Sequence, residues 1–78
     1  MLRLFAAARE AAGTGREDVR GRTVGEVLTA ACTRHGGHFA DVLATSRVWV
    51  NGTAANAADL LRPGDEVAVL PPVSGGTV

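Results

Sequence analysis

The 78-residue sequence contains no lysine, and its eight basic residues are all arginine. Eight acidic residues balance them, so the formal net charge is zero. Nucleic-acid-binding proteins gather basic residues on one face, and attachment to an anionic membrane also needs positive charge. We therefore expect neither nucleic acid nor a membrane as a partner. Without lysine, the protein also cannot form lysine-linked chains with copies of itself.

Cysteine is nearly absent as well, because Cys32 is the only one. One cysteine excludes an internal disulfide and a multi-cysteine zinc site, and it suits a reducing compartment. We therefore predict a cytoplasmic location. No apolar stretch has the length of a transmembrane span. The apolar beginning of the chain does not predict a signal peptide, because Arg9 and Glu10 interrupt it.

Length and composition favour one small globular domain. The chain has no room for a second domain, and its hydrophobic fraction of 46% is too high for disorder. We predict a domain over residues 1–72 and a flexible C-terminal tail over residues 73–78.

The clearest local pattern predicts a helix from about Val24 to His35. Thr23 can cap this helix, and Glu26 three residues later completes a capping box. Apolar residues follow at helical spacing, which gives the helix one apolar stripe. After Gly36-Gly37, the apolar residues Phe39, Val42 and Leu43 predict a short helical turn that packs on the core.

Strand patterns lie on both sides of this helix. The predicted strands are Leu2–Ala6, Arg16–Arg22, Arg47–Val50, Thr53–Ala55 and Glu66–Leu70, with a short helix over Ala7–Ala12. Asn51-Gly52 is typical of a hairpin turn, and Pro63-Gly64-Asp65 of a turn before the last strand. This order predicts an α+β domain, a mixed sheet of about four to five strands packed on one main helix.

Side chains offer little chemistry for an enzyme. Cys32 lies on the apolar stripe, so we interpret it as a small buried core residue. His35 and His38 lack a third ligand, and we expect both on the surface at a helix end. The acidic pairs Glu17-Asp18 and Asp65-Glu66 are expected to be solvated. We predict no catalytic residue, no metal site and no bound cofactor.

The end of the sequence is more specific. Pro71-Pro72-Val73-Ser74-Gly75-Gly76 directly follows an apolar strand and resembles the C-terminus of the MoaD/ThiS family of sulfur carriers. The match is nearest to MoaD, the small subunit of molybdopterin synthase. The segments that agree upstream are Phe5-Ala6, Thr23 to Leu28, Val50-Asn51-Gly52 and Leu61 to Val67. The resemblance therefore covers nearly the whole chain and implies a ubiquitin-like β-grasp fold.

The resemblance also implies how such a tail works. In this family an adenylyltransferase similar to ubiquitin-activating enzymes uses ATP to activate the terminal glycine, here Gly76, which then becomes a thiocarboxylate. Glycine lacks Cβ, so Gly75-Gly76 can pass closely through another protein's active site. Pro71 and Pro72 act as a stiff spacer, and an extended segment from Pro71 to Gly76 reaches roughly 20 Å.

Partner contacts are expected on the open face of the sheet. Phe5 and Leu70 correspond to hydrophobic contact positions in the MoaD pattern, and Trp49 is expected to join them. For Trp49 the alternative is partial burial near a sheet edge. The partners implied are the activating enzyme and the large subunit of molybdopterin synthase, or another sulfur-accepting enzyme.

Thr77-Val78 departs from the family pattern, because activated carriers end at the second glycine. Gly76 is here part of a peptide bond, so we expect a protease to remove Thr77-Val78. An alternative is a paralogue that has lost carrier activity.

Three further readings stay open. The sulfur acceptor can belong to thiamin, cysteine or secondary-metabolite synthesis instead of molybdopterin synthesis. The chain can also be a ubiquitin-like modifier that is conjugated to protein lysines through Gly76. A plain interaction module, which needs no tail, is the third.

Overall fold

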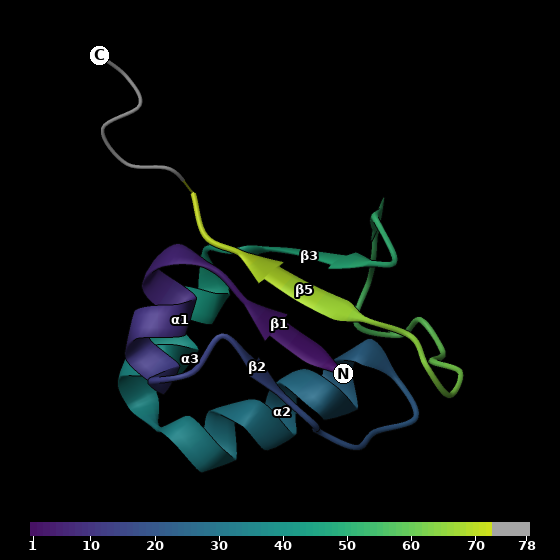
Figure 1. The fold of residues 1–78 in the computed structure, drawn as a ribbon, viewed down its shortest axis with the longest axis horizontal. Helices are drawn as coiled ribbons and strands as arrows, with labels where there is room; N and C mark the ends of the chain where they lie inside the picture. Colours follow the sequence, from purple (N-terminus) through teal and green to yellow (C-terminus); the bar gives the residue numbers. More distant parts are fainter. Residues whose placement is uncertain (73–78) are drawn as a thin grey trace.

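The computed structural model describes residues 1–72. These residues form three helices and five strands, and the termini of the described part lie at opposite ends of the sheet (Figure 1). The strands are β1 (Leu2–Leu4), β2 (Arg16–Glu17), β3 (Arg47–Val50), β4 (Thr53–Ala54) and β5 (Val67–Leu70). The helices are α1 (Ala6–Ala12), α2 (Val24–His35) and α3 (Gly37–Ala44).

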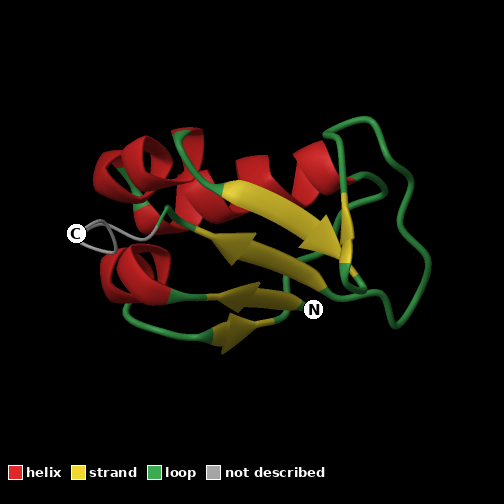
Figure 2. Ribbon diagram, turned by 90° about the horizontal axis from the view of Figure 1, so that it is seen from above, coloured by secondary structure: helices red, strands yellow, loops and turns green. Residues whose placement is uncertain are grey.

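The five strands form one mixed sheet in the order β2-β1-β5-β3-β4. The central pair, β1 and β5, is parallel, and the other three pairs are antiparallel. The first and last strands are therefore neighbours, as Figure 2 also shows. This arrangement confirms the predicted β-grasp class.

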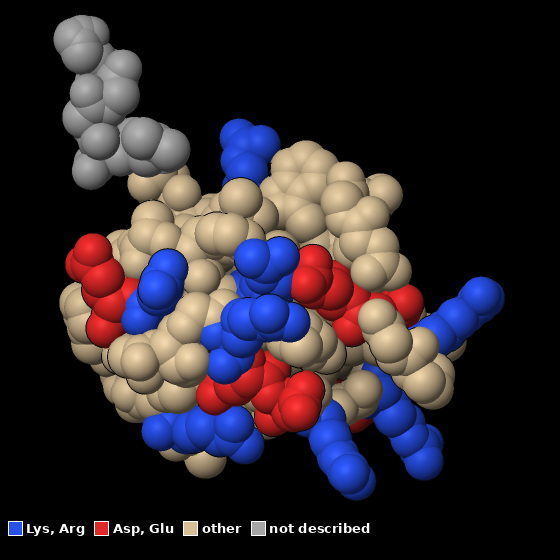
Figure 3. Space-filling view, viewed as in Figure 1, with Lys and Arg blue, Asp and Glu red and all other residues tan. Residues whose placement is uncertain are grey.

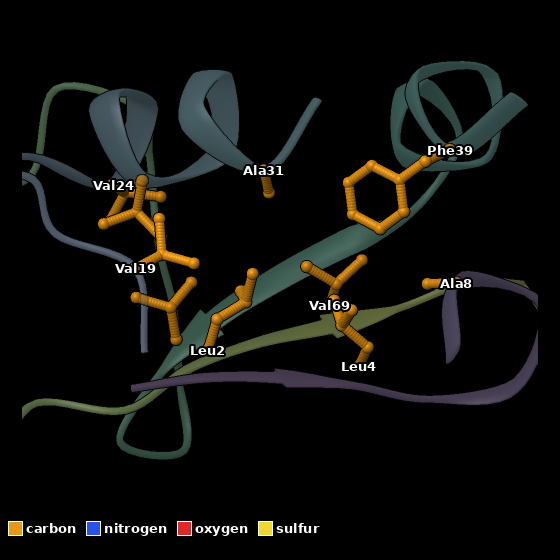
Figure 4. Close-up of a cluster of buried hydrophobic side chains, with 10 residues drawn as sticks. Leu2, Leu4, Ala8, Val19, Val24, Ala31, Phe39 and Val69 are labelled. Atoms are coloured by element: carbon orange, nitrogen blue, oxygen red, sulfur yellow. The ribbon is translucent and has the colours of Figure 1, made fainter. Parts of the chain in front are cut away.

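The core lies between the sheet and the helices (Figure 4). Leu2 and Leu4 of β1 and Val67 and Val69 of β5 are at most 2% exposed, and all four point toward the helices. Phe39 of α3 is the largest side chain among the fully buried residues. All three helices therefore contribute to the helical layer, Ala8 from α1 included, where the sequence predicted one main helix and only a short turn after it.

Local signals explain the ends of α2. The Thr23 hydroxyl accepts a hydrogen bond from the Glu26 N–H at 3.1 Å, as the capping pattern predicted. The Glu26 carboxylate, however, bonds the backbone N–H of Arg22 and not that of the cap residue. Gly36, at φ 93°, ends the helix, and Gly37 already begins α3.

The predicted second strand is too long. Only Arg16 and Glu17 pair with β1, because the chain then leaves the sheet to reach α2. On the way Val19 enters the core at 8% exposure. The hairpin turn is confirmed, since Asn51 and Gly52 both have positive φ, as a type I′ turn requires.

Candidate functional site

The face of the sheet that points away from the helices carries the predicted contact residues. Val67 and Val69 point inward, so Ala68 and Leu70 point outward, as the alternation predicted. The same alternation turns Phe5, just after β1, to the outer face. Phe5 and Leu70 are 36% and 37% exposed, which is high for large apolar side chains.

An open hollow of about 710 Å³ occupies this face, and we call it the outer-face hollow. Its lining residues are Phe5, Thr45, Arg47, Trp49, Gly52, Glu66, Ala68, Leu70, Pro71 and Pro72. In the register of β3 and β5, Trp49 is paired with Ala68 and Arg47 with Leu70. The small Ala68 side chain leaves the space beside Trp49 unfilled.

The structure therefore brings Phe5, Trp49 and Leu70 together at one surface. Trp49 is half-buried and lines the hollow, so it shares the surface with the other two. Whether the three bind a partner stays a prediction. Pro71 and Pro72 line the same hollow, so the chain leaves the sheet beside these apolar side chains.

The remaining predicted tail residues, Val73, Ser74, Gly75 and Gly76, lie outside the described residues. So do Thr77 and Val78.

Charged groups border the apolar centre of the outer-face hollow. Arg3 of β1 lies 3.7 Å from the Glu66 carboxylate, and its guanidinium carbon lies 5.3 Å from the centre of the Phe5 ring. Both side chains of the ion pair are 41% exposed, so water weakens their attraction. The Arg3 Nε atom is buried and has no hydrogen-bond partner within residues 1–72. Arg47 adds a second exposed positive charge at the rim.

The sequence did not single out Arg47, Glu66 or Ala68 as site residues. The alternation of side chains along a strand could have found them. Arg47 lies two residues before Trp49, and Ala68 and Glu66 lie two and four residues before Leu70, so all three point to the same face as these residues. Thr45 and Gly52 carry no such signal. They reach the hollow only because the chain turns at both ends of β3.

Other chemistry-bearing residues lie elsewhere. Cys32 is partly buried against the core, and burial raises the pKa of its thiol. A raised pKa leaves less thiolate at neutral pH, which disfavours a nucleophilic role. Within residues 1–72, no three His, Cys, Asp or Glu side chains gather as metal ligands would.

Glu17 and His35 depart from the expectation that both are solvated. Each side chain is only 11% exposed, and the Glu17 carboxylate contacts both the His35 ring and the Arg34 guanidinium, the latter at 3.0 Å. Burial alone raises the pKa of Glu17, but the hydrogen bonds from His35 and Arg34 bring it below the ordinary value. The His35 ring also packs on Phe39, with 5.2 Å between ring centres. The contact joins β2 to the end of α2.

Asp65 was expected to be solvated, but its side chain is held by hydrogen bonds within the protein. Its carboxylate accepts hydrogen bonds from the Arg62 N–H and the Asn51 amide, both at 2.9 Å. These bonds favour the ionised form and lower the pKa of Asp65, the Arg62 bond most. Both contacts hold the turn before β5 against the hairpin turn at Asn51, which is a structural role.

Comparison with protein families matches residues 2–76 to the ThiS family. The chain belongs to this family. The match ends at Gly76 and confirms the resemblance found in the sequence. No curated protein matches the chain.

Solved structures agree with this assignment. SAMP1 from Haloferax volcanii is 38% identical to this ThiS-family chain, with a TM-score of 0.80 and coverage of 96% of both chains. The small archaeal modifier protein 1 (SAMP1) from Methanosarcina acetivorans is 29% identical, with a TM-score of 0.85 and coverage of 96% and 93%. A putative molybdopterin converting factor, subunit 1, from Pyrococcus furiosus is 28% identical, with a TM-score of 0.75 and coverage of 92% and 94%.

Family membership therefore places this ThiS-family chain among small carrier or modifier proteins, which are not enzymes themselves. Among residues 1–72, none of the three helices has the length and apolar character needed to cross a membrane.

Proposed function

We propose that this ThiS-family chain is a sulfur carrier whose working group is the carboxyl group of Gly76. The observation that carries the proposal is the position of Pro71 and Pro72, which line the same hollow as Phe5, Trp49 and Leu70. A partner that covers the outer-face hollow therefore receives the segment that follows Pro72. Aromatic side chains near the centre of such a surface typically supply a large share of the binding energy.

The proposed chemistry takes place in partner enzymes. An adenylyltransferase related to ubiquitin-activating enzymes joins the Gly76 carboxylate to the AMP part of ATP and releases pyrophosphate. A sulfide equivalent from a sulfur donor then replaces AMP at the acyl carbon, which leaves a thiocarboxylate. ATP is thus a substrate of the activating enzyme, and this chain itself holds no cofactor.

The sequence places one condition on this chemistry. Because Thr77 follows Gly76, the carboxyl group of Gly76 is free only after the bond between these two residues is cleaved. The family match ends at Gly76, which supports cleavage at this bond. We propose that a protease removes Thr77-Val78 before activation.

The sulfur acceptor that we favour is the large subunit of a molybdopterin synthase. The likeness to a Pyrococcus furiosus protein described as a putative molybdopterin converting factor, subunit 1, supports this choice. An enzyme of thiamin, cysteine or secondary-metabolite synthesis is the alternative acceptor. The location that we propose is the cytoplasm, because a chain with a single cysteine suits a reducing compartment.

A second candidate function is that of a ubiquitin-like modifier, which forms an amide bond between Gly76 and a lysine of a target protein. The 38% identity to SAMP1 of Haloferax volcanii favours it, since that protein's relatives are described as small archaeal modifier proteins. Because the chain contains no lysine, such a modifier would be attached as single copies and not as lysine-linked chains.

Mass spectrometry tests both functions. The chain ending at Gly76 and the chain ending at Val78 are each incubated with ATP, a sulfur donor and an activating enzyme from the same genome. We expect only the chain ending at Gly76 to gain the mass of sulfur for oxygen. If the chain that keeps Thr77-Val78 gains sulfur equally well, cleavage is unnecessary and the mechanism is wrong.

Two further measurements separate the candidates. After trypsin digestion, a modifier leaves its C-terminal tryptic peptide joined through Gly76 to lysines of target proteins, whereas a carrier leaves none. This remnant is longer than Gly-Gly, because no arginine or lysine directly precedes Gly75. Deletion of Gly75 to Val78 abolishes either function but leaves a plain interaction module active. The matched control is the Gly76→Pro variant of the chain ending at residue 76, which keeps a terminal carboxylate but distorts the end that enters the partner.

A further inference from the structure

A second hollow, of about 520 Å³, lies at the end of the sheet where β1 begins. It separates the loop before α2 from the turn before β5, and it shares no lining residue with the outer-face hollow. Three arginines line it, namely Arg20, Arg22 and Arg62, and we call it the arginine hollow. Figure 3 shows basic side chains projecting at the lower right, where Figure 1 places the loop and the turn.

The two walls of the arginine hollow are joined by backbone contacts. The Leu61 N–H donates a hydrogen bond to the Arg22 carbonyl at 2.8 Å, so Arg22 and Arg62 lie on directly bonded segments. The Arg22 N–H in turn donates to the Glu26 carboxylate of α2 at 2.8 Å. Gly21 packs so closely that a Cβ there would lie 2.8 Å from the Val27 nitrogen. These contacts hold the backbone of the segments that carry Arg22 and Arg62 in place.

The side chains of the lining carry unbalanced positive charge. Asp65 is their only carboxylate, and its two oxygens already accept hydrogen bonds from Asn51 and from the Arg62 backbone. Three arginines against one carboxylate leave the side chains of the lining at +2, and the ammonium group of Met1, which also lines the hollow, adds a further positive charge. Within residues 1–72, none of these three arginines forms an ion pair. Neighbouring like charges repel, and a bound anion would relieve that repulsion.

The hollow also has an apolar part. Leu61 is half-buried and lines it, and Val19 is 8% exposed at its base. The volume lies within the range of about 300–1,000 Å³ that is typical of sites for small molecules. A lone inorganic ion would leave most of this space empty.

We propose that the arginine hollow binds the phosphate group of a small, partly apolar molecule. A phosphate monoester carries a charge of about −1.5 to −2 at neutral pH, which offsets the positive charge of the side chains in the lining. Guanidinium groups bind phosphate through paired hydrogen bonds, and such charge-assisted bonds are about twice as strong as neutral ones. The apolar part of the molecule lies against Leu61 and Val19. This site is independent of the proposed carrier function, because it uses other residues.

Titration of the full chain with phenyl phosphate, followed by the amide signals in NMR spectra, tests the proposal. We expect saturable shifts confined to residues 19–22 and 61–65. Inorganic phosphate at the same ionic strength should bind at the same residues but more weakly, because it lacks the apolar part. Equal affinity of the two probes contradicts an organic ligand.

The variant Arg22→Gln/Arg62→Gln should weaken phenyl phosphate binding at least about tenfold, because two charge-assisted hydrogen bonds are lost. Both side chains are exposed, so we expect the variant to fold, and its amide spectrum checks this directly. The control Arg47→Gln removes an exposed arginine of the outer-face hollow and should bind as well as the parent chain. Shifts that rise without saturation, or equal losses in both variants, overturn the proposal. Tighter binding of an oligoglutamate peptide than of phenyl phosphate overturns it too, since it indicates an acidic protein partner.

Discussion

Trp49 of β3 and Ala68 of β5 lie directly opposite each other, and both line the outer-face hollow. Directly paired residues have Cβ atoms about 4.5–5.5 Å apart, so the Ala68 methyl group leaves the face of the neighbouring indole free. A large residue at position 68 would occupy this space without entering the core, because Ala68 points outward.

We therefore predict that Ala68→Leu weakens binding of the activating enzyme at least about tenfold while the free energy of unfolding changes by less than about 1 kcal/mol. Isothermal titration calorimetry measures the first quantity, and urea denaturation the second. Ala58→Leu adds the same side chain at an exposed position outside the hollow and should leave binding unchanged. Equal effects of the two variants would show that the outer-face hollow is not the docking surface.

The two phenylalanines should respond in opposite ways to truncation. Phe39 is fully buried, so Phe39→Ala should cost about 3–5 kcal/mol of stability, a large share of the total for a domain this small. Phe5 is 36% exposed on the outer face, so Phe5→Ala should cost much less stability and weaken enzyme binding instead. Thermal unfolding and calorimetry on both variants check this contrast. A Phe5→Ala variant that binds normally would remove Phe5 from the proposed contact surface.

The sequence was informative wherever the signal is local. The capping residue Thr23, the turn at Asn51-Gly52 and the alternation in β5 each depend on neighbours within a few residues, and all three were predicted correctly. Strand parity also placed Phe5 and Leu70 on the outer face. The family resemblance rested on the tail residues together with matching segments along nearly the whole chain, whose order and spacing are readable without a structure.

The errors concern contacts between distant segments. Glu17 and His35 are 18 residues apart, and neither has a sequence neighbour that predicts their contact. The early end of β2 follows from the path to α2, which no local pattern encodes. The sequence did not predict the arginine hollow for the same reason. Arg22 and Arg62 are brought together by the backbone hydrogen bond from the Leu61 N–H to the Arg22 carbonyl, which joins segments far apart in the chain.

Glu17 gives a pH-dependent prediction. Because the folded-state pKa of Glu17 is lowered, the stabilisation is fully present above the ordinary carboxyl pKa, about 4.3, and is lost as the pH falls through the folded value. Glu17→Gln should therefore cost about 1–3 kcal/mol at neutral pH, where it breaks charged hydrogen bonds to Arg34 and His35.

Urea denaturation of both proteins between pH 7 and pH 3 measures this difference, which should shrink steadily at the acid end. The neighbouring Asp18 is exposed, so Asp18→Asn provides the control and should change stability by less than about 0.5 kcal/mol. A Glu17→Gln effect that stays constant down to pH 3 would assign the loss to packing and not to charge.

Ala6, the first residue of α1, has φ 50° and lies in the left-handed region that costs a residue with a side chain about 1–2 kcal/mol. This conformation turns the chain sharply from β1 into α1 and leaves Phe5 on the outer face. Glycine adopts positive φ without that cost, although it loses about 0.4–1 kcal/mol more through its greater freedom in the unfolded chain. We predict that Ala6→Gly stabilises the domain by up to about 1 kcal/mol.

The adjacent Ala7 is exposed in the same helix but has no positive φ, so Ala7→Gly should destabilise the domain by about 0.5–1 kcal/mol. Chemical denaturation of both variants therefore yields changes of opposite sign from the same substitution at neighbouring positions. Two losses of similar size would mean that the turn after Phe5 holds no strain. The chain would then adopt it at no cost, and Phe5 would be held by its backbone hydrogen bond to the Val69 carbonyl and by its contact with Arg3.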